Sequence, residues 1–223
     1  MRTLTSLAAA LVLAAPLAAQ QPAAAHANHD PDNKVAGAGA LPAGWHARTD
    51  NGGPVTNVKF AKMGAGYHTT LGPAVILWRD EDKVQERFHT LATFTQTKPS
   101  QHAEGYGFLI GGKALDGEGQ KYTYFLIRQD GKFLIKQRDG KTTTNITDGW
   151  VDNAAVVKPG TDGKSVNKLE VDAKASADKV NFSVNGKVVH TMDPKDIDSS
   201  GIVGFRVNHN LDLHIEGFDI HRL

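Results

Sequence analysis

Turn signals recur along most of this chain at intervals of about eight to twelve residues, the spacing of all-β sandwiches and barrels. Pairs such as Asp130-Gly131, Pro159-Gly160 and Asn185-Gly186 separate short segments that are apolar, β-branched or aromatic. Helical periodicity is almost absent, and no internal repeat indicates a propeller or solenoid. We therefore predict an all-β domain, either a sandwich, a jelly roll or a barrel.

The stretch from Gly201 to Leu223 carries this pattern most clearly. Gly201 to Val207 is apolar and β-branched, as in a buried strand, and Asn208-His209-Asn210 has the composition of a turn. Apolar and polar residues then alternate from Leu211 to Glu216, which predicts a strand with one face in water. Gly217 interrupts the alternation, as a β-bulge would.

The N-terminal residues have the composition of an export signal followed by a linker. Met1-Arg2 precedes an apolar run from Leu7 to Ala19, with small residues after it. We predict a signal peptide over residues 1–25, a disordered linker over 26–43 and one β-sandwich domain over 44–223. The predicted signal peptide indicates a bacterial protein that is secreted or periplasmic. An attached, disordered N-terminus is the alternative.

Composition excludes several classes of function. The chain has no cysteine, so thiol chemistry and cysteine-ligated metals are ruled out. Its 25 basic and 24 acidic residues balance, and no basic stripe suits nucleic acid. After the signal, no second apolar stretch is long enough to span a membrane. We expect a monomer that does not bind nucleic acid and has no membrane span, either soluble or loosely attached to a membrane.

The order of segments resembles a known superfamily. A Phe-rich strand, a Gly-Tyr-Gly-Phe strand, an Asp-Gly hairpin and a Leu169–Val189 hairpin containing Phe182-Ser183-Val184-Asn185-Gly186 precede the closing Gly201–Leu223 stretch. This order resembles the concanavalin A-like lectin/glucanase superfamily, and the end of the chain is similar to bacterial secreted 3-keto-disaccharide hydrolase-like, or family-16-like, domains. The resemblance covers residues 45–223 and implies a two-sheet antiparallel jelly-roll sandwich that binds carbohydrate.

The catalytic signature of that superfamily is missing from this chain. Its glucanases carry a Glu-x-Asp-x-x-Glu strand, whose carboxylates attack and protonate the glycosidic bond. The nearest match here is Asp212-Leu213-His214-Ile215-Glu216, which lacks a third carboxylate at the right spacing. We therefore expect a non-catalytic glycan-recognising domain. A glycoside or 3-keto-sugar hydrolase or lyase, and a structural envelope domain without a small ligand, remain open.

The best polar candidates lie at the end of the chain. Arg206 is a single charge in an apolar strand, where it could line a groove for a carboxylated or hydroxylated sugar, or form an ion pair with Glu104 or Glu216. Asn208, His209 and Asn210 follow at a strand end, where binding loops gather. His209 could be a base or a sugar ligand, and the alternative is a turn chosen only for its conformation.

Further candidates come from elsewhere in the chain. Trp78, Tyr106 and Trp150 could stack on sugar rings, although a place in the core is the favoured interpretation for each of them. His68 lies in a polar segment flanked by glycine and could face a groove. In the catalytic alternative, His209 or His68 would act with Arg206 and a carboxylate such as Glu104.

We expect no cofactor. The acidic segments Asp80-Glu81-Asp82 and Asp116-Gly117-Glu118 could hold calcium, but neither has the spacing of an EF-hand, and solvated loops would look the same.

Overall fold

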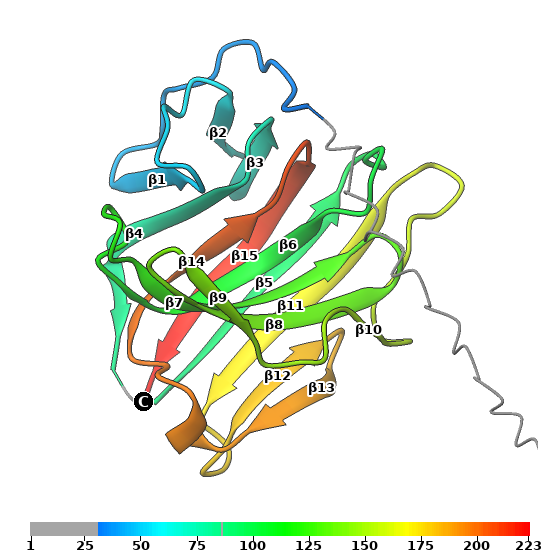
Figure 1. Ribbon diagram of the computed structural model, residues 1–223. Coiled ribbons are helices and arrows are strands. Elements are labelled where there is room, and N and C mark those ends of the chain that lie inside the picture. The colour runs from blue at the N-terminus through cyan, green and yellow to red at the C-terminus, as the bar shows by residue number, and fades with distance from the viewer. Residues whose placement is uncertain (1–30, 86) are drawn as a thin grey trace, which may run out of the picture.

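The computed structural model describes residues 31–85 and 87–223. The predicted signal peptide and residues 26–30 of the predicted linker lie outside this part of the chain. The described residues form two antiparallel sheets, one of eight strands (sheet A) and one of seven (sheet B), stacked face to face (Figure 1). This confirms the predicted two-sheet antiparallel jelly-roll sandwich. Within the described residues, no helix is long and apolar enough to cross a bilayer.

Sheet A has the strand order β1-β4-β14-β6-β7-β8-β10, with β9 paired to β8. Its strands are β1 (Trp45–Thr49), β4 (Val75–Val84), β6 (Gly105–Lys113), β7 (Lys121–Arg128), β8 (Lys132–Asp139), β9 (Thr142–Asn145), β10 (Val151–Asp152) and β14 (Gly201–Val207).

Sheet B has the order β13-β12-β11-β5-β15-β3-β2. Its strands are β2 (Val58–Met63), β3 (Gly66–Leu71), β5 (Phe88–Gln96), β11 (Ser165–Ala173), β12 (Val180–Val184), β13 (Lys187–Met192) and β15 (Asp212–Arg222). A short 3-10 helix, η1 (Pro194–Asp196), follows β13, and the Asp193 side chain caps it.

The core lies between the sheets and follows from the two-residue period of the strands. Every second residue of β5 is buried, from Phe88 to Gln96. Phe205 of β14 lies among aromatic rings from both sheets: its centroid is 5.8 Å from Phe94, 6.2 Å from Phe108 and 4.7 Å from Phe218. These rings hold the two sheets together at the centre of the sandwich.

The two closing strands do not pair with each other. β14 lies between β4 and β6 in sheet A, whereas β15 lies between β5 and β3 in sheet B. The turn at Asn208-His209-Asn210 therefore crosses from one sheet to the other, and Asn210 has a left-handed φ of 54°. The predicted bulge is confirmed, because the register of β15 against β5 shifts between Glu216 and Asp219, and Gly217 has a φ of 61°.

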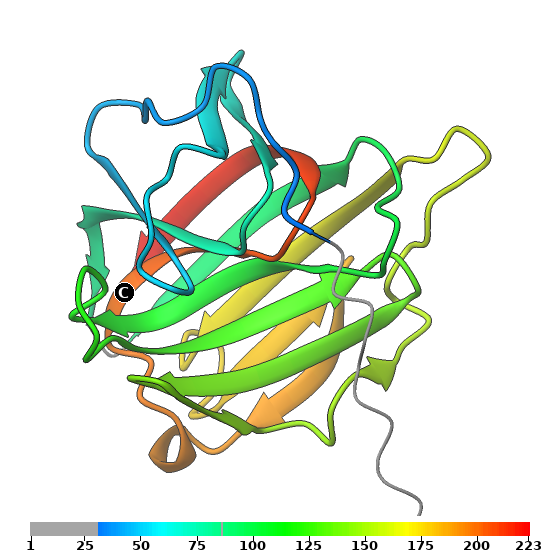
Figure 2. The same ribbon diagram turned by 45° about the horizontal axis from the view of Figure 1, so that its top comes forward.

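Residues 31–43 contain no strand or helix but lie against the end of the sandwich, beside the β14–β15 turn (Figure 2). We call residues 31–36 the strap. The backbone N–H of Asn33 donates to Asn210 Oδ1 at 2.8 Å, and Asn210 Nδ2 donates to the carbonyl of Pro31 at 3.1 Å. This part of the predicted disordered linker therefore has specific hydrogen-bond partners, which its composition did not reveal.

Gly72 allows the strap to approach, and its substitution gives a direct test. A Cβ at Gly72 would lie 2.2 Å from the carbonyl oxygen of Asn33. We expect Gly72→Ala to displace the strap and to lower the free energy of unfolding by about 1–3 kcal/mol, as overpacking does. Amide hydrogen exchange of residues 33–36 should accelerate.

Gly53→Ala is the matched control, because its Cβ would meet only Thr49 Oγ1 at 3.7 Å, an ordinary contact. If amide hydrogen exchange of residues 33–36 is unchanged in the Gly72→Ala variant, the position of the strap does not depend on its close approach to Gly72.

The outer faces of the sheets differ in character. On sheet A, a second apolar cluster that includes Trp78, Leu109, Tyr124 and Leu126 packs on the side away from the core. On sheet B, the corresponding side carries polar residues such as His68, Thr95 and His214, which stand opposite one another in the ladders. The apolar and aromatic side chains packed outside the core therefore lie on sheet A.

Candidate functional site

Arg206 lies on the outer face of sheet A, in an interior strand. Its side chain is only 8% exposed and forms a two-pronged ion pair with Asp50, in the turn that follows β1. The Nη1 atom donates to Asp50 Oδ1, and Nη2 donates to Oδ2 at 2.6 Å. Arg206 therefore forms an ion pair, as one of the two interpretations predicted, but its partner is Asp50 and not Glu104 or Glu216.

A second arginine binds the same carboxylate. Arg138 of β8 places Nη1 3.3 Å from Asp50 Oδ1, and its side chain is 14% exposed. Burial raises the pKa of Asp50, but the hydrogen bond and charge of Arg206 and the charge of Arg138 outweigh it, so the pKa lies below its ordinary value. Asp50 is therefore a carboxylate at neutral pH, with 35% of its side chain exposed.

The β14–β15 turn meets this carboxylate. Arg206 Nε donates to Asn208 Oδ1 at 3.1 Å, and His209 lies close enough for its charge to lower the pKa of Asp50. His209 Nδ1 is 2.7 Å from Asp32 Oδ1 of the strap. We call Asp50, Arg138, Arg206, Asn208, His209 and Asp32 the Asp50 cluster.

A hollow of about 220 Å³ opens beside the Asp50 cluster. Asp32, Asp50 and His209 line it together with Asn57 and Pro73. Both carboxylates and the imidazole can exchange hydrogen bonds with hydroxyl groups, because a carboxylate accepts and an imidazole does either. The hollow is therefore chemically suited to a polyhydroxylated molecule.

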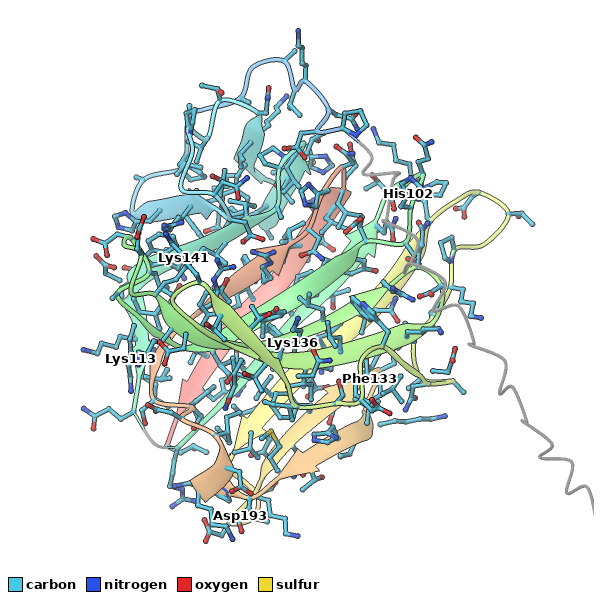
Figure 3. The ribbon with its side chains drawn as sticks, viewed as in Figure 1. His102, Lys113, Phe133, Lys136, Lys141 and Asp193 are labelled. Atoms are coloured by element: carbon cyan, nitrogen blue, oxygen red, sulfur yellow. The ribbon has the colours of Figure 1, made fainter. Side chains whose placement is uncertain are left out.

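Aromatic side chains extend the Asp50 cluster across sheet A. The Arg206 guanidinium lies 5.9 Å from the ring centroid of Tyr124, whose ring is 5.7 Å from that of Tyr122. Burial raises the pKa of Tyr124 to about 12, so its hydroxyl stays protonated. Lys136, which follows Tyr124 across the ladder to β8, lies on the same outer face (Figure 3).

Trp78 and Trp150 lie on the same face but are already packed. Trp78 is 4% exposed, and the ring of His46 stacks on it with centroids 5.5 Å apart. The Arg128 guanidinium lies 4.4 Å from the centroid of Trp150. Each of these rings therefore meets a polar partner from its own chain, and a sugar would reach Trp78 only if His46 moved.

The remaining sequence candidates are placed elsewhere. His68 lies on sheet B, where its Nε2 is 3.2 Å from Asp212 Oδ1. Glu104 precedes β6 and is half-buried. Asn210 holds the strap.

Tyr106 needs a correction, because it is fully buried in the core between the sheets and offers no surface to a ligand. Burial also raises the pKa of its hydroxyl.

The acidic segments do not form a calcium loop. Asp80-Glu81-Asp82 continues strand β4, and the Asp82 carboxylate accepts from Arg79 Nε at 2.7 Å. Glu118 lies 3.5 Å from Lys141 Nζ. Within residues 31–85 and 87–223, no group of three or more histidine, aspartate or glutamate side chains could hold a metal ion.

Sequence reasoning missed Asp50, the carboxylate at the centre of the Asp50 cluster, and could not pair Arg138 with it. Asp50 opens the Asp50-Asn51-Gly52-Gly53-Pro54 segment, whose composition is that of a turn, so its carboxylate carried no separate signal. Arg138 alternates with apolar residues of β8 and looks like any solvated charge on a strand.

Comparison with known proteins shows the fold. No family model matches the chain, and no curated protein matches its sequence. Among solved structures, the carbohydrate-binding module CBM66 from Bacillus subtilis superposes with a TM-score of 0.56 at 10% identity, over 80% of this chain and 95% of that one. The chain has a lectin-like β-sandwich fold.

Two further structures agree. A Bacillus subtilis protein of unknown function with a galectin-like fold has a TM-score of 0.51 at 10% identity, over 80% of this chain and 89% of that one. The exoplasmic/lumenal domain of VIP36, in a form bound to Ca²⁺ and Man3GlcNAc, has a TM-score of 0.50 at 8% identity, over 80% and 85%. These likenesses show the fold and leave the family open.

Proposed function

We propose that this chain recognises carbohydrate without catalysis, through the Asp50 cluster on sheet A. The observation that carries the proposal is the Asp50 carboxylate, which two arginines hold in place while a third of its side chain stays exposed. Oδ1 accepts from both arginines and Oδ2 from one, so Oδ2 keeps a lone pair for a sugar hydroxyl. Holding the carboxylate in advance reduces the entropy that binding costs.

Two other observations support the proposal. The hollow beside Asp50 is lined by Asp32, Asp50, Asn57 and His209, whose side chains can exchange hydrogen bonds with the hydroxyl groups of a sugar. CBM66 and the VIP36 domain, which share the fold, are named or described with carbohydrate. We further propose that the protein is exported and acts outside the cytoplasm, since residues 1–25 have the composition of a signal peptide.

The test is a glycan array probed with the full chain, followed by calorimetry on the best ligand. We expect Arg138→Gln to weaken binding about tenfold, because a hydrogen bond to a charged group contributes about 1.5–3 kcal/mol. Asp50 keeps its two-pronged pair with Arg206 in this variant, so the fold should be retained. The control is Arg128→Gln on β7, whose guanidinium contacts Asp130 and Trp150.

If Arg138→Gln and Arg128→Gln bind the glycan with equal affinity, the binding site does not lie at the Asp50 cluster. An array on which the folded protein binds nothing would instead favour a structural envelope domain without a small ligand.

A hydrolase or lyase acting on a glycoside or 3-keto sugar is the second candidate. The Asp32–His209 pair favours it, because a carboxylate that holds an imidazole is a common arrangement of a general base. Turnover of a 3-keto disaccharide that is lost in His209→Gln would establish this candidate and overturn the non-catalytic one.

A further inference from the structure

A second hollow, of about 410 Å³, lies between the strap and the end of sheet B. Its lining includes Lys34 of the strap, Lys59 of β2, Thr70 of β3, Lys98 after β5, Asn210 and Asp212. This volume falls in the range of small-molecule sites. No member of the Asp50 cluster lines this hollow, so the two hollows have different linings.

Asp212 forms the polar floor of this hollow and is fully occupied by its own neighbours. Its Oδ2 accepts from Thr70 Oγ1 at 3.1 Å and lies 3.1 Å from Lys98 Nζ. Its Oδ1 accepts from Thr97 Oγ1 and lies 3.2 Å from His68 Nε2. With four polar partners on two oxygens, the carboxylate has no lone pair left for the other lysines.

The charges that line the hollow therefore do not cancel. Asp212 compensates Lys98, which is its ion-pair partner. Neither Lys34 nor Lys59 has a carboxylate partner within the part of the chain that the structure describes. Lys34 and Lys59 are both exposed and line a hollow in which the one carboxylate among the described lining residues is already satisfied, so the net positive charge of the lining attracts an anion.

The strap forms one wall of the hollow. Its wall is fixed where Asn33 and Pro31 bond to Asn210, and where the Val35 N–H donates to Asn57 Oδ1 at 3.4 Å. Lys34 belongs to this wall, and Lys59 of β2 lines the same hollow. An anion between them would bridge the strap to the sandwich.

We propose that this hollow binds a small molecule through an oxyanion group, a phosphate or a carboxylate, held by Lys34 and Lys59. Ammonium groups bind such anions as point charges and do not require the planar fork of arginine. Thr70 and the Asp212 floor set the depth that the anion reaches.

The experiment is an amide NMR titration of the full chain with inorganic phosphate and, separately, with glucuronate, each against chloride at equal ionic strength. We expect saturable shifts at residues 33–36 and 211–212 with at least one of the two probes. The probe that saturates identifies the anion. Linear shifts, or shifts spread over all lysines with both probes, would overturn the proposal.

The decisive variant is Lys34→Gln combined with Lys59→Gln. Removing both charges should weaken binding about tenfold or more. Lys62→Gln is the matched control, because Lys62 is an exposed lysine of the same strand that does not line the hollow. Equal binding by the double variant and the wild type would contradict the site, while glycan binding at the Asp50 cluster should be unchanged in both variants.

Discussion

Asp50→Asn is expected to lower the free energy of unfolding by about 3 kcal/mol, the low end of what breaking a buried ion pair costs. The reason is asymmetry of burial: Arg206 is 8% exposed and would be left charged without its partner, whereas Asp50 is 35% exposed. Arg206→Met should cost less, because the remaining carboxylate can hydrate and still has Arg138. Chemical denaturation of both variants measures the difference.

The same pair predicts a pH dependence with a defined sign. The pKa of Asp50 lies below its ordinary value of 3.8, so its contribution to stability is present above about pH 4 and is lost as the pH falls through the lower pKa of the folded state. Asp50→Asn should therefore lose part of the acid sensitivity. If Arg206→Met destabilised the protein more than Asp50→Asn, the burial argument would be wrong.

Phe205→Ala is expected to lower the free energy of unfolding by about 3–5 kcal/mol, because it leaves a cavity among rings that belong to both sheets. Phe205 is fully buried, and its ring also stacks on Trp45 with centroids 5.6 Å apart. In a domain of this size the melting temperature should fall by about 10 °C. Scanning calorimetry gives the value directly.

Phe218→Ala is the matched control for Phe205→Ala. Phe218 contacts the same ring at 4.7 Å but lies partly exposed at the bulge of β15. Its loss should cost clearly less, because water can enter the space. Equal losses in the two variants would show that the centre of the sandwich relaxes around the missing ring.

The elements that could be predicted are those with a local cause. The Asp130-Gly131 and Asn185-Gly186 turns were found because two-residue hairpins demand positive φ, and Asn185 and Gly186 have φ values of 51° and 76°. The alternation of residues along β5 predicts which of them face the core. Alternation also places Tyr106 on the same strand face as Phe108 and Ile110. The burial of Tyr106 therefore follows from the strand pattern, which argues against a role in stacking on sugars.

What could not be predicted depends on contacts between distant segments. The pattern of β14 and β15 gives the face of each strand but not its partner, so their assignment to different sheets was hidden. Arg206 was conspicuous as a lone charge, yet its partner Asp50 lies 156 residues earlier in the chain. The strap is polar and small in composition, and only the structure shows its hydrogen bonds to Asn210.

The position of β14 and β15 has a consequence for how the chain reaches its fold. Each occupies an interior place in its sheet, between β4 and β6 in one and between β5 and β3 in the other. Synthesis from the N-terminus produces all four flanking strands before residues 201–222 exist, so neither sheet can be completed cotranslationally until that stretch has left the ribosome. Assembly then depends on contacts of high sequence separation, which form slowly. Until β14 and β15 are in place, each sheet is therefore divided into two groups of strands that no ladder joins.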